Sequence, residues 1–264
     1  MNVKKNTSLV GTFKIPTEPS TPNDPNSIND ANLLFTAGLQ YSRKGLRGEA
    51  LRSYLRAARL GNALAAYNGG CMLSDARGTG RDPAGAVRLW RRAARLGDPD
   101  AMYNLAWAYR RGFGVSHSAK IAFSWTKAAA EGGVLDGQFN LAQAYLRGEG
   151  TKQDLTKAFM WFEKAAIAGC VDAQYNLGVC WQYGEGVEAN ERLAVLWYRR
   201  AAKSGHPHAQ YNLGLCILRG EGTRRNYKEA VAWLRKAREQ GVKKAAKVLD
   251  RLRTKEGRKL EMGR

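Results

Sequence analysis

Apolar residues recur along the chain at helical spacing, in two stripes that alternate. Between residues 172 and 183 the first stripe is Ala173, Leu177 and Cys180, spaced i, i+4 and i+7. The second stripe, which ends at Gly205, consists of Ala194, Trp197, Ala201 and Ala202. Such spacing places apolar side chains on one face of a helix. The pattern therefore predicts two antiparallel helices, with small residues where their backbones approach.

This pair of stripes repeats every 36 residues. Asn occupies one register position at Asn68, Asn104, Asn140, Asn176 and Asn212. Ala and Gly keep the same period at Ala50, Ala86, Ala122, Ala158, Ala194 and Ala230, and at Gly61, Gly97, Gly133, Gly169, Gly205 and Gly241. Residues that keep one period without slippage are typical of repeat arrays, in which each unit buries its apolar face against its neighbours. The fold class predicted is all-α, with about six helix-turn-helix repeats.

The repeated motif resembles the Sel1-like repeat, a relative of the tetratricopeptide repeat with a longer loop between its helices. The resemblance lies in Ala-Gln-Tyr-Asn-Leu-Gly from Ala173, Gly-Glu-Gly from Gly184, and the later Ala, Trp, Ala-Ala and Gly positions. It covers residues 62–243 strongly and 31–61 weakly. The resemblance implies a right-handed α/α superhelix, or solenoid, and a scaffold or adaptor role, often in bacterial or organelle-associated signalling. Some secreted relatives have paired cysteines and reported β-lactam binding; this chain lacks those pairs, so neither property is expected.

Three segments follow from these patterns. Residues 1–28 hold Pro16, Pro19, Pro22 and Pro25 among polar residues, a composition that favours a disordered tail or polyproline II tether. A docking peptide for another domain is the alternative interpretation. Residues 29–243 are the predicted repeat solenoid, with a divergent first unit. Residues 244–264 are rich in charge and predict a basic helix that caps the array.

Two local features of each repeat suggest helix ends. Asp100, Asp136 and Asp172 are predicted N-caps, and His208 takes the same place in its repeat. The glycine steps are predicted C-caps rather than phosphate loops, because no strand precedes them. They are Gly112/Gly114, Gly148/Gly150, Gly184/Gly186 and Gly220/Gly222.

Charge is the other strong signal, since 43 Lys and Arg against 23 Asp and Glu give a net charge of +20. An excess of this size attracts acidic proteins, nucleic acid or anionic lipid. No apolar run approaches the roughly 20 residues of a membrane span. The N-terminus is a poor secretory signal, and Cys71, Cys170, Cys180 and Cys216 are expected to be free thiols. A cytoplasmic protein is expected.

The Asn series admits two interpretations. In tetratricopeptide repeats an Asn near this point of the first helix faces a groove and binds peptide backbone; the other interpretation is a bond to neighbouring backbone. If the first helix of each repeat lines a concave groove, positions three, six and seven after each Asn face inward. Together with Asn104, Asn140, Asn176 and Asn212, the predicted groove residues are Trp107, Arg110, Arg111, Gln143, Arg147, Gln182, Tyr183 and Arg219, with Leu146, Val179, Leu215 and Leu218 at the remaining positions. Arginines beside aromatics suit an acidic peptide or a nucleic-acid strand.

Basic pairs recur on the second helix of the repeats, opposite its apolar stripe. They are Arg91-Arg92, Arg199-Arg200 and Arg235-Lys236. Taken singly they are solvated charges; taken together with basic residues at both ends of the chain they would form a continuous convex stripe. Such a stripe would bind nucleic acid through phosphate contacts.

The sequence offers no catalytic, metal or cofactor site. His117, His206 and His208 lie in or beside turns, and no Cys or carboxylate stands at ligand spacing from them. The function predicted is therefore a non-catalytic scaffold that binds an acidic or extended segment of a partner protein in its groove. A nucleic-acid-binding solenoid is the alternative.

Overall fold

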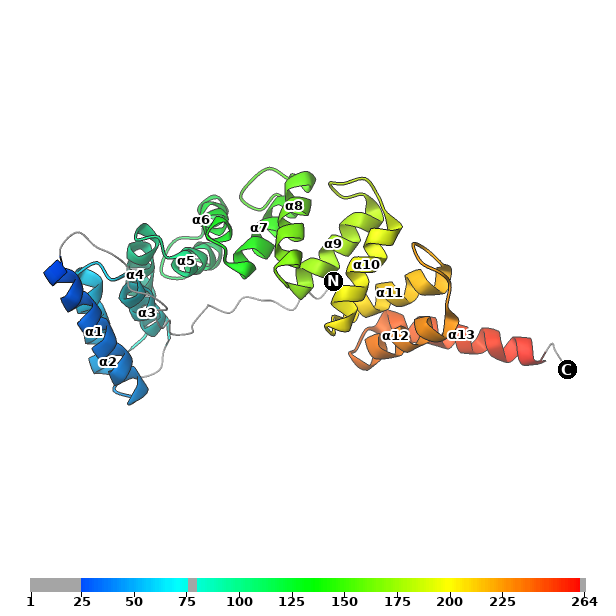
Figure 1. Ribbon diagram of the computed structural model, residues 1–264, viewed down its shortest axis with the longest axis horizontal. Coiled ribbons are helices and arrows are strands. Elements are labelled where there is room, and N and C mark those ends of the chain that lie inside the picture. The colour runs from blue at the N-terminus through cyan, green and yellow to red at the C-terminus, as the bar shows by residue number, and fades with distance from the viewer. Residues whose placement is uncertain (1–24, 76–79, 262–264) are drawn as a thin grey trace. The chain divides into compact units, whose positions relative to one another are not determined.

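The computed structural model describes residues 25–75 and 80–261, and every regular element in them is an α-helix (Figure 1). The helices are α1 (Pro25–Arg43), α2 (Arg47–Arg59), α3 (Ala63–Ser74), α4 (Pro83–Arg95), α5 (Pro99–Arg111), α6 (Ala119–Glu131), α7 (Leu135–Arg147), α8 (Leu155–Ile167), α9 (Val171–Tyr183), α10 (Glu191–Lys203), α11 (Pro207–Arg219), α12 (Tyr227–Glu239) and α13 (Lys243–Glu261). From α3 onward equivalent helices start 36 residues apart. The predicted helix pairs are confirmed. We call the odd-numbered helices from α3 to α11 the A helices and the even-numbered ones from α4 to α12 the B helices.

The helices pack into two compact units, each with its own core. The first unit runs from α1 to the start of α7 and includes loop residues 149–152; the second holds residues 138–148 and continues from residue 153 through α13. The alanines that recur every 36 residues are buried in every repeat, because two helix backbones approach there. In most of the helices that carry these alanines, one larger side chain fills the space beside the alanine. These residues are Tyr54 in α2 and Trp90, Phe162, Tyr198 and Leu234 in the B helices, all fully buried.

Each B helix begins at a side-chain cap. The capping residues are Asp82, Ser118, Asp154, Asn190 and Asn226, and each accepts a hydrogen bond from the backbone N–H three residues further on. These residue types satisfy N–H groups that have no partner within the helix. The 36-residue period of the caps fixes where every B helix starts.

The N-caps of the A helices lie two residues before the predicted ones. Asp98, not Asp100, accepts the N–H of Ala101 at 2.8 Å. His206, not His208, caps α11, and Cys170 occupies the N-cap position of α9 without a side-chain bond. The predicted aspartates stand instead in the first turn, where their charge favours the positive end of the helix dipole.

The glycine steps do more than end helices. The first glycine of a step ends the A helix, as predicted, but the second lies against the first turn of the preceding B helix. A Cβ atom added to it would collide with the backbone of that turn. The pairs are Gly114 with Pro83, Gly150 with Ala119, Gly186 with Leu155, and Gly222 with Glu191. The loop of each repeat is therefore packed onto its predecessor, which explains why glycine recurs there.

The first helix begins earlier than the predicted boundary at residue 29. Helix α1 already begins at Pro25, where proline is tolerated in a first turn, so residues 25–28 are helical. The rest of the predicted tail, residues 1–24, lies outside the described residues. Within the described residues, none of the helices has both the length and the apolar character needed to cross a membrane.

Candidate protein-binding surface

In the second unit, three A helices end in long, exposed side chains at one register position. Arg147, Tyr183 and Arg219 are the last residues of α7, α9 and α11. Tyr183 is 67% exposed, and the Arg219 side chain is 57% exposed. The Arg219 guanidinium lies 3.5 Å from the Glu221 carboxylate, a surface ion pair that adds little stability. These side chains are consequently accessible to a partner.

The turn after each A helix explains this exposure. Gly184 adopts a left-handed conformation with φ 73°, and its N–H donates to the Cys180 carbonyl oxygen. The chain leaves the helix axis immediately after Tyr183, so no further helical turn covers that side chain. Arginine at the same place also meets the negative end of the helix dipole.

The predicted residues between these helix ends are partly held inside the unit. Gln182 is half-buried and accepts a hydrogen bond of 2.7 Å from the Tyr198 hydroxyl. Gln143 is half-buried too, and its Oε1 atom finds no donor among the described residues. Val179 and Leu218 pack against the core of the second unit. Of the groove residues predicted in the second unit, those that are exposed are thus Arg147, Tyr183 and Arg219.

The Asn series points mainly inward. Asn104 is 0% exposed, and its Nδ2 atom lies 3.9 Å from the Cys71 sulfur. Asn212 is half-buried and acts on the hydroxyls of Tyr175 and Tyr198 in the preceding repeat, where it lowers the pKa of both tyrosines against the larger raising effect of burial. Asn176 donates to the Asp172 carbonyl oxygen at 2.7 Å, and Asn140 is half-buried. Asn104 has no exposed surface and therefore cannot contact a partner directly.

The first unit carries the equivalent residues of one further A helix, α5. Trp107 is half-buried and packs edge-on against Phe113, with ring centroids 5.1 Å apart. Arg110 is half-buried, and Arg111, the last residue of α5, is exposed. The first unit therefore repeats the exposed arginine of the second.

The basic pairs of the B helices divide into two kinds of residue. The first member is held internally in two of them: Arg91 donates to the Tyr109 hydroxyl at 2.5 Å, and Arg199 pairs with Glu229 at 2.5 Å. Arg235 is the exception and is exposed. The second members, Arg92, Arg200 and Lys236, are all exposed. The pairs are thus not uniformly solvated.

A series of cation–aromatic contacts in the second unit was not predicted. Lys164, Arg200 and Lys236 lie 4.8, 4.4 and 4.7 Å from the ring centroids of Trp161, Trp197 and Trp233. Each contact joins residues three apart on one helix, a spacing at which side chains meet. The signal was present in the sequence as Trp followed three residues later by Lys or Arg, at 36-residue intervals.

The geometry around the largely buried imidazole of His206 fixes its protonation state. Its Nδ1 atom accepts the N–H of Ala209 at 3.1 Å, which requires that nitrogen to be unprotonated. The ring stacks on Tyr175 with centroids 4.5 Å apart, and Nε2 lies 3.5 Å from the Asp172 carboxylate. Burial lowers the pKa of His206 below its usual 6.5, opposed by Asp172 and assisted by His208.

This arrangement predicts a loss of stability in mild acid. Because the folded pKa of His206 is lowered, the unfolded chain binds its proton more readily. The stabilisation is complete above the unfolded pKa of about 6.5 and is lost as pH falls below it toward the folded pKa. His206→Asn keeps a good N-cap and removes the titration. Urea unfolding at neutral and mildly acidic pH should show a smaller loss in this variant than in the wild type; equal losses would show that other groups cause the pH dependence.

Nucleophilic and metal chemistry find little support among the described residues. Burial raises the pKa of Cys180 to about 12 and that of Cys216 to about 11, so both remain thiols at neutral pH. As predicted, none of the four cysteines forms a disulfide, and Cys71, Cys180 and Cys216 are buried. In the described part of the chain, no group of three or more His, Cys, Asp or Glu side chains is placed to hold a metal ion.

Comparison with known proteins identifies the repeat. The Sel1 repeat family matches five consecutive segments, residues 63–98, 99–134, 135–170, 171–206 and 207–242. No curated protein matches the chain in sequence.

Two crystal structures resemble the chain closely. One is a protective antigen of uropathogenic Escherichia coli strains with an SLR fold, 31% identical, with a TM-score of 0.75; the match covers 82% of this chain and 47% of that protein. The other is a Sel1 repeat protein of Oxalobacter formigenes, 32% identical, with a TM-score of 0.68 over 84% of this chain and 66% of that one. The chain thus spans about half the length of the first relative. With five matched repeats over most of its length, the chain belongs to the Sel1 repeat family.

Proposed function

We propose that the protein is a non-catalytic scaffold whose second unit binds an extended acidic segment of a partner protein. The binding surface, which we call the A surface, consists of Gln143, Arg147, Gln182, Tyr183 and Arg219. The observation that carries the proposal is the exposure of Arg147, Tyr183 and Arg219 at one register position of three successive A helices. The excess positive charge of the chain supports it, because such a field speeds association with acidic partners.

The repeat spacing sets the sequence that the A surface would accept. We take the step from one A helix to the next as about 10 Å, the usual distance between neighbouring packed helices, and an extended chain advances about 3.3 Å per residue. With this step, one repeat corresponds to about three residues of bound peptide. The arginines would each take a carboxylate through forked hydrogen bonds, and Tyr183 between them would take an apolar side chain. The expected motif is acidic, apolar, acidic, with two residues between successive positions.

A peptide titration tests this proposal. The probe is a labelled peptide of about 12 residues with Glu, Leu and Glu at these spacings and prolines between them to keep it extended. Fluorescence anisotropy should show that Arg147→Glu with Arg219→Glu weakens binding at least about tenfold, because two charge-assisted contacts become repulsive. The melting temperature should stay close to that of the wild type, since both side chains are exposed.

The matched control is Arg192→Glu with Lys203→Glu, which changes the charge equally at exposed positions of α10. This control should bind the peptide nearly as well as the wild type. Equal weakening in both variants would reduce the effect to net charge and contradict the A surface. A labelled DNA single strand tests the alternative function. If the protein binds this DNA more tightly than the peptide, and if that binding weakens steeply with salt, a nucleic-acid function would replace the proposal.

A further inference from the structure

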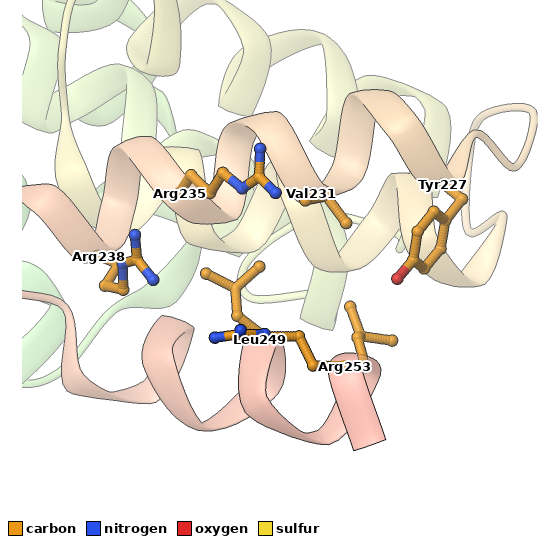
Figure 2. Close-up of a pocket in the computed structure, with 7 residues that line it drawn as sticks. Tyr227, Val231, Arg235, Arg238, Leu249 and Arg253 are labelled. Atoms are coloured by element: carbon orange, nitrogen blue, oxygen red, sulfur yellow. The ribbon is translucent and has the colours of Figure 1, made fainter. Parts of the chain in front are cut away.

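A groove lies between the last two helices, at the end of the second unit. Its volume is about 650 Å³. Figure 2 shows α12 on one side and α13 on the other, with Leu249 and Arg253 in the space between them and Arg235 lying over α12. We call it the end groove; its main lining residues are Tyr227, Val231, Arg235, Arg238, Leu249 and Arg253.

The preceding repeat shows which contacts are made at the position equivalent to the end groove. Leu249 and Arg253 of α13 stand 36 residues after Leu213 and Ile217 of α11. Leu213 and Ile217 are fully buried in one cluster with Ala230, a residue of the following B helix, α12. No B helix follows α13 in the described residues, so the equivalent face of α13 borders the end groove instead. An exposed arginine, Arg253, stands there in place of a buried isoleucine.

The ion pair between successive B helices also indicates which charge a ligand of the end groove would carry. Arg199 of α10 forms its ion pair with Glu229 of the next B helix, α12. Arg235 occupies the same register position of α12, one repeat later. Among the residues whose side chains the structure describes (29–75 and 80–254), no carboxylate pairs with Arg235, Arg238 or Arg253. A helix placed one repeat beyond α12 would bring its own acidic residue to Arg235.

We infer that the end groove binds an acidic amphipathic helix of a partner protein. The helix would lie where another B helix of the array would lie. Its apolar stripe would rest on the half-buried Val231 and on Leu252, a further lining residue that is half-buried, and its carboxylates would point toward the three arginines. Laying one apolar helix face into a groove is a common way to recognise a peptide, and arginine suits carboxylate pairing. A second copy of this chain is a poorer occupant, because its own end groove would bring three like charges to the interface. The inference concerns a different surface and a helical rather than an extended ligand, so it does not depend on the A surface.

The test uses a probe designed from the array itself. The probe is a labelled peptide with the α12 sequence in which Glu replaces every Lys and Arg; it keeps the apolar stripe and the glutamate of the Arg199 pair. We expect binding with one peptide per chain and a Kd of about 10 μM, accompanied by a gain of helical circular dichroism as the peptide folds. Arg235→Glu with Arg238→Glu should weaken this binding at least about tenfold.

Two controls separate this site from the A surface and from net charge. Arg192→Glu with Lys203→Glu should leave the helical peptide bound, and the end-groove variant should still bind the extended acidic peptide if that peptide uses the A surface. Unchanged affinity of the helical peptide for the Arg235→Glu, Arg238→Glu variant would overturn the inference. Sedimentation that shows a dimer in the wild type and a monomer in that variant would also overturn it, because a second copy would then be the occupant.

Discussion

Replacing Gly186 with alanine is expected to lower the free energy of unfolding by about 3 to 5 kcal/mol. The residue has φ 77°, a backbone conformation that residues with a side chain rarely adopt. The added Cβ would also overlap the carbonyl group of Leu155, in the first turn of α8. Backbone cannot move aside as the end of a flexible side chain can, so the loop must separate from the preceding helix. Urea unfolding followed by circular dichroism measures the loss.

Gly205→Ala is the matched control for this prediction. Gly205 has φ 90°, but apart from its chain neighbours no heavy atom lies within 4 Å of the point that a Cβ atom would occupy. Its alanine variant bears the conformational strain alone, about 1 to 2 kcal/mol. Equal losses in the two variants would show that the contact with α8 contributes nothing and that conformation alone selects glycine in these loops.

Gly178→Ala is expected to destabilise the chain by about 2 kcal/mol, although alanine is the better helix former. Gly178 lies in α9, and a Cβ there would stand 2.6 Å from the ring of Tyr198 in α10. That ring is fully buried, and its hydroxyl is tied to Gln182, so it cannot swing away. Overpacking therefore outweighs the gain in helix propensity. Gly48→Ala, at an open position of α2, should be neutral or slightly stabilising by the same assay.

The chain itself suggests how to relieve the clash. Two repeats earlier, the same two register positions hold Ala106 and Thr126. In a double-mutant cycle, Tyr198→Thr should make Gly178→Ala less harmful by at least about 1 kcal/mol. A coupling energy near zero would mean that the glycine is not required by the tyrosine.

Much of the fold could be predicted because the helix pair is a local unit. Stripe spacing, alanine contacts and helix-ending glycines all follow from residues within one repeat, and these predictions are confirmed. The A-helix caps were misplaced because Asp98 and Asp100 both look like caps. Pro99 between them marks the first helical residue and would have indicated Asp98.

Contacts between repeats were harder to predict. The second glycine of each step looks like part of a cap, and only the neighbouring helix shows why a side chain is excluded. From the sequence, Asn104 could equally be a ligand contact or a core residue, because its position relative to Cys71 depends on tertiary packing. The exposure of Tyr183 and Arg219 followed from their register. The end groove could not be predicted, since it depends on how α13 packs against α12.

The packing of each glycine loop on its predecessor bears on how such chains evolve. Since the contact joins only successive repeats, duplication or loss of a whole unit by recombination recreates the same contact at the new junction. Change within a unit depends on its own packing: Gly178 faces Tyr198, whereas one repeat earlier Ala142 and Phe162 hold the same two positions and are both fully buried. A B helix packed on α13 as α12 packs on α11 would meet Arg253 at the position where α12 meets Ile217. The same local contact is therefore compatible with arrays of different repeat number.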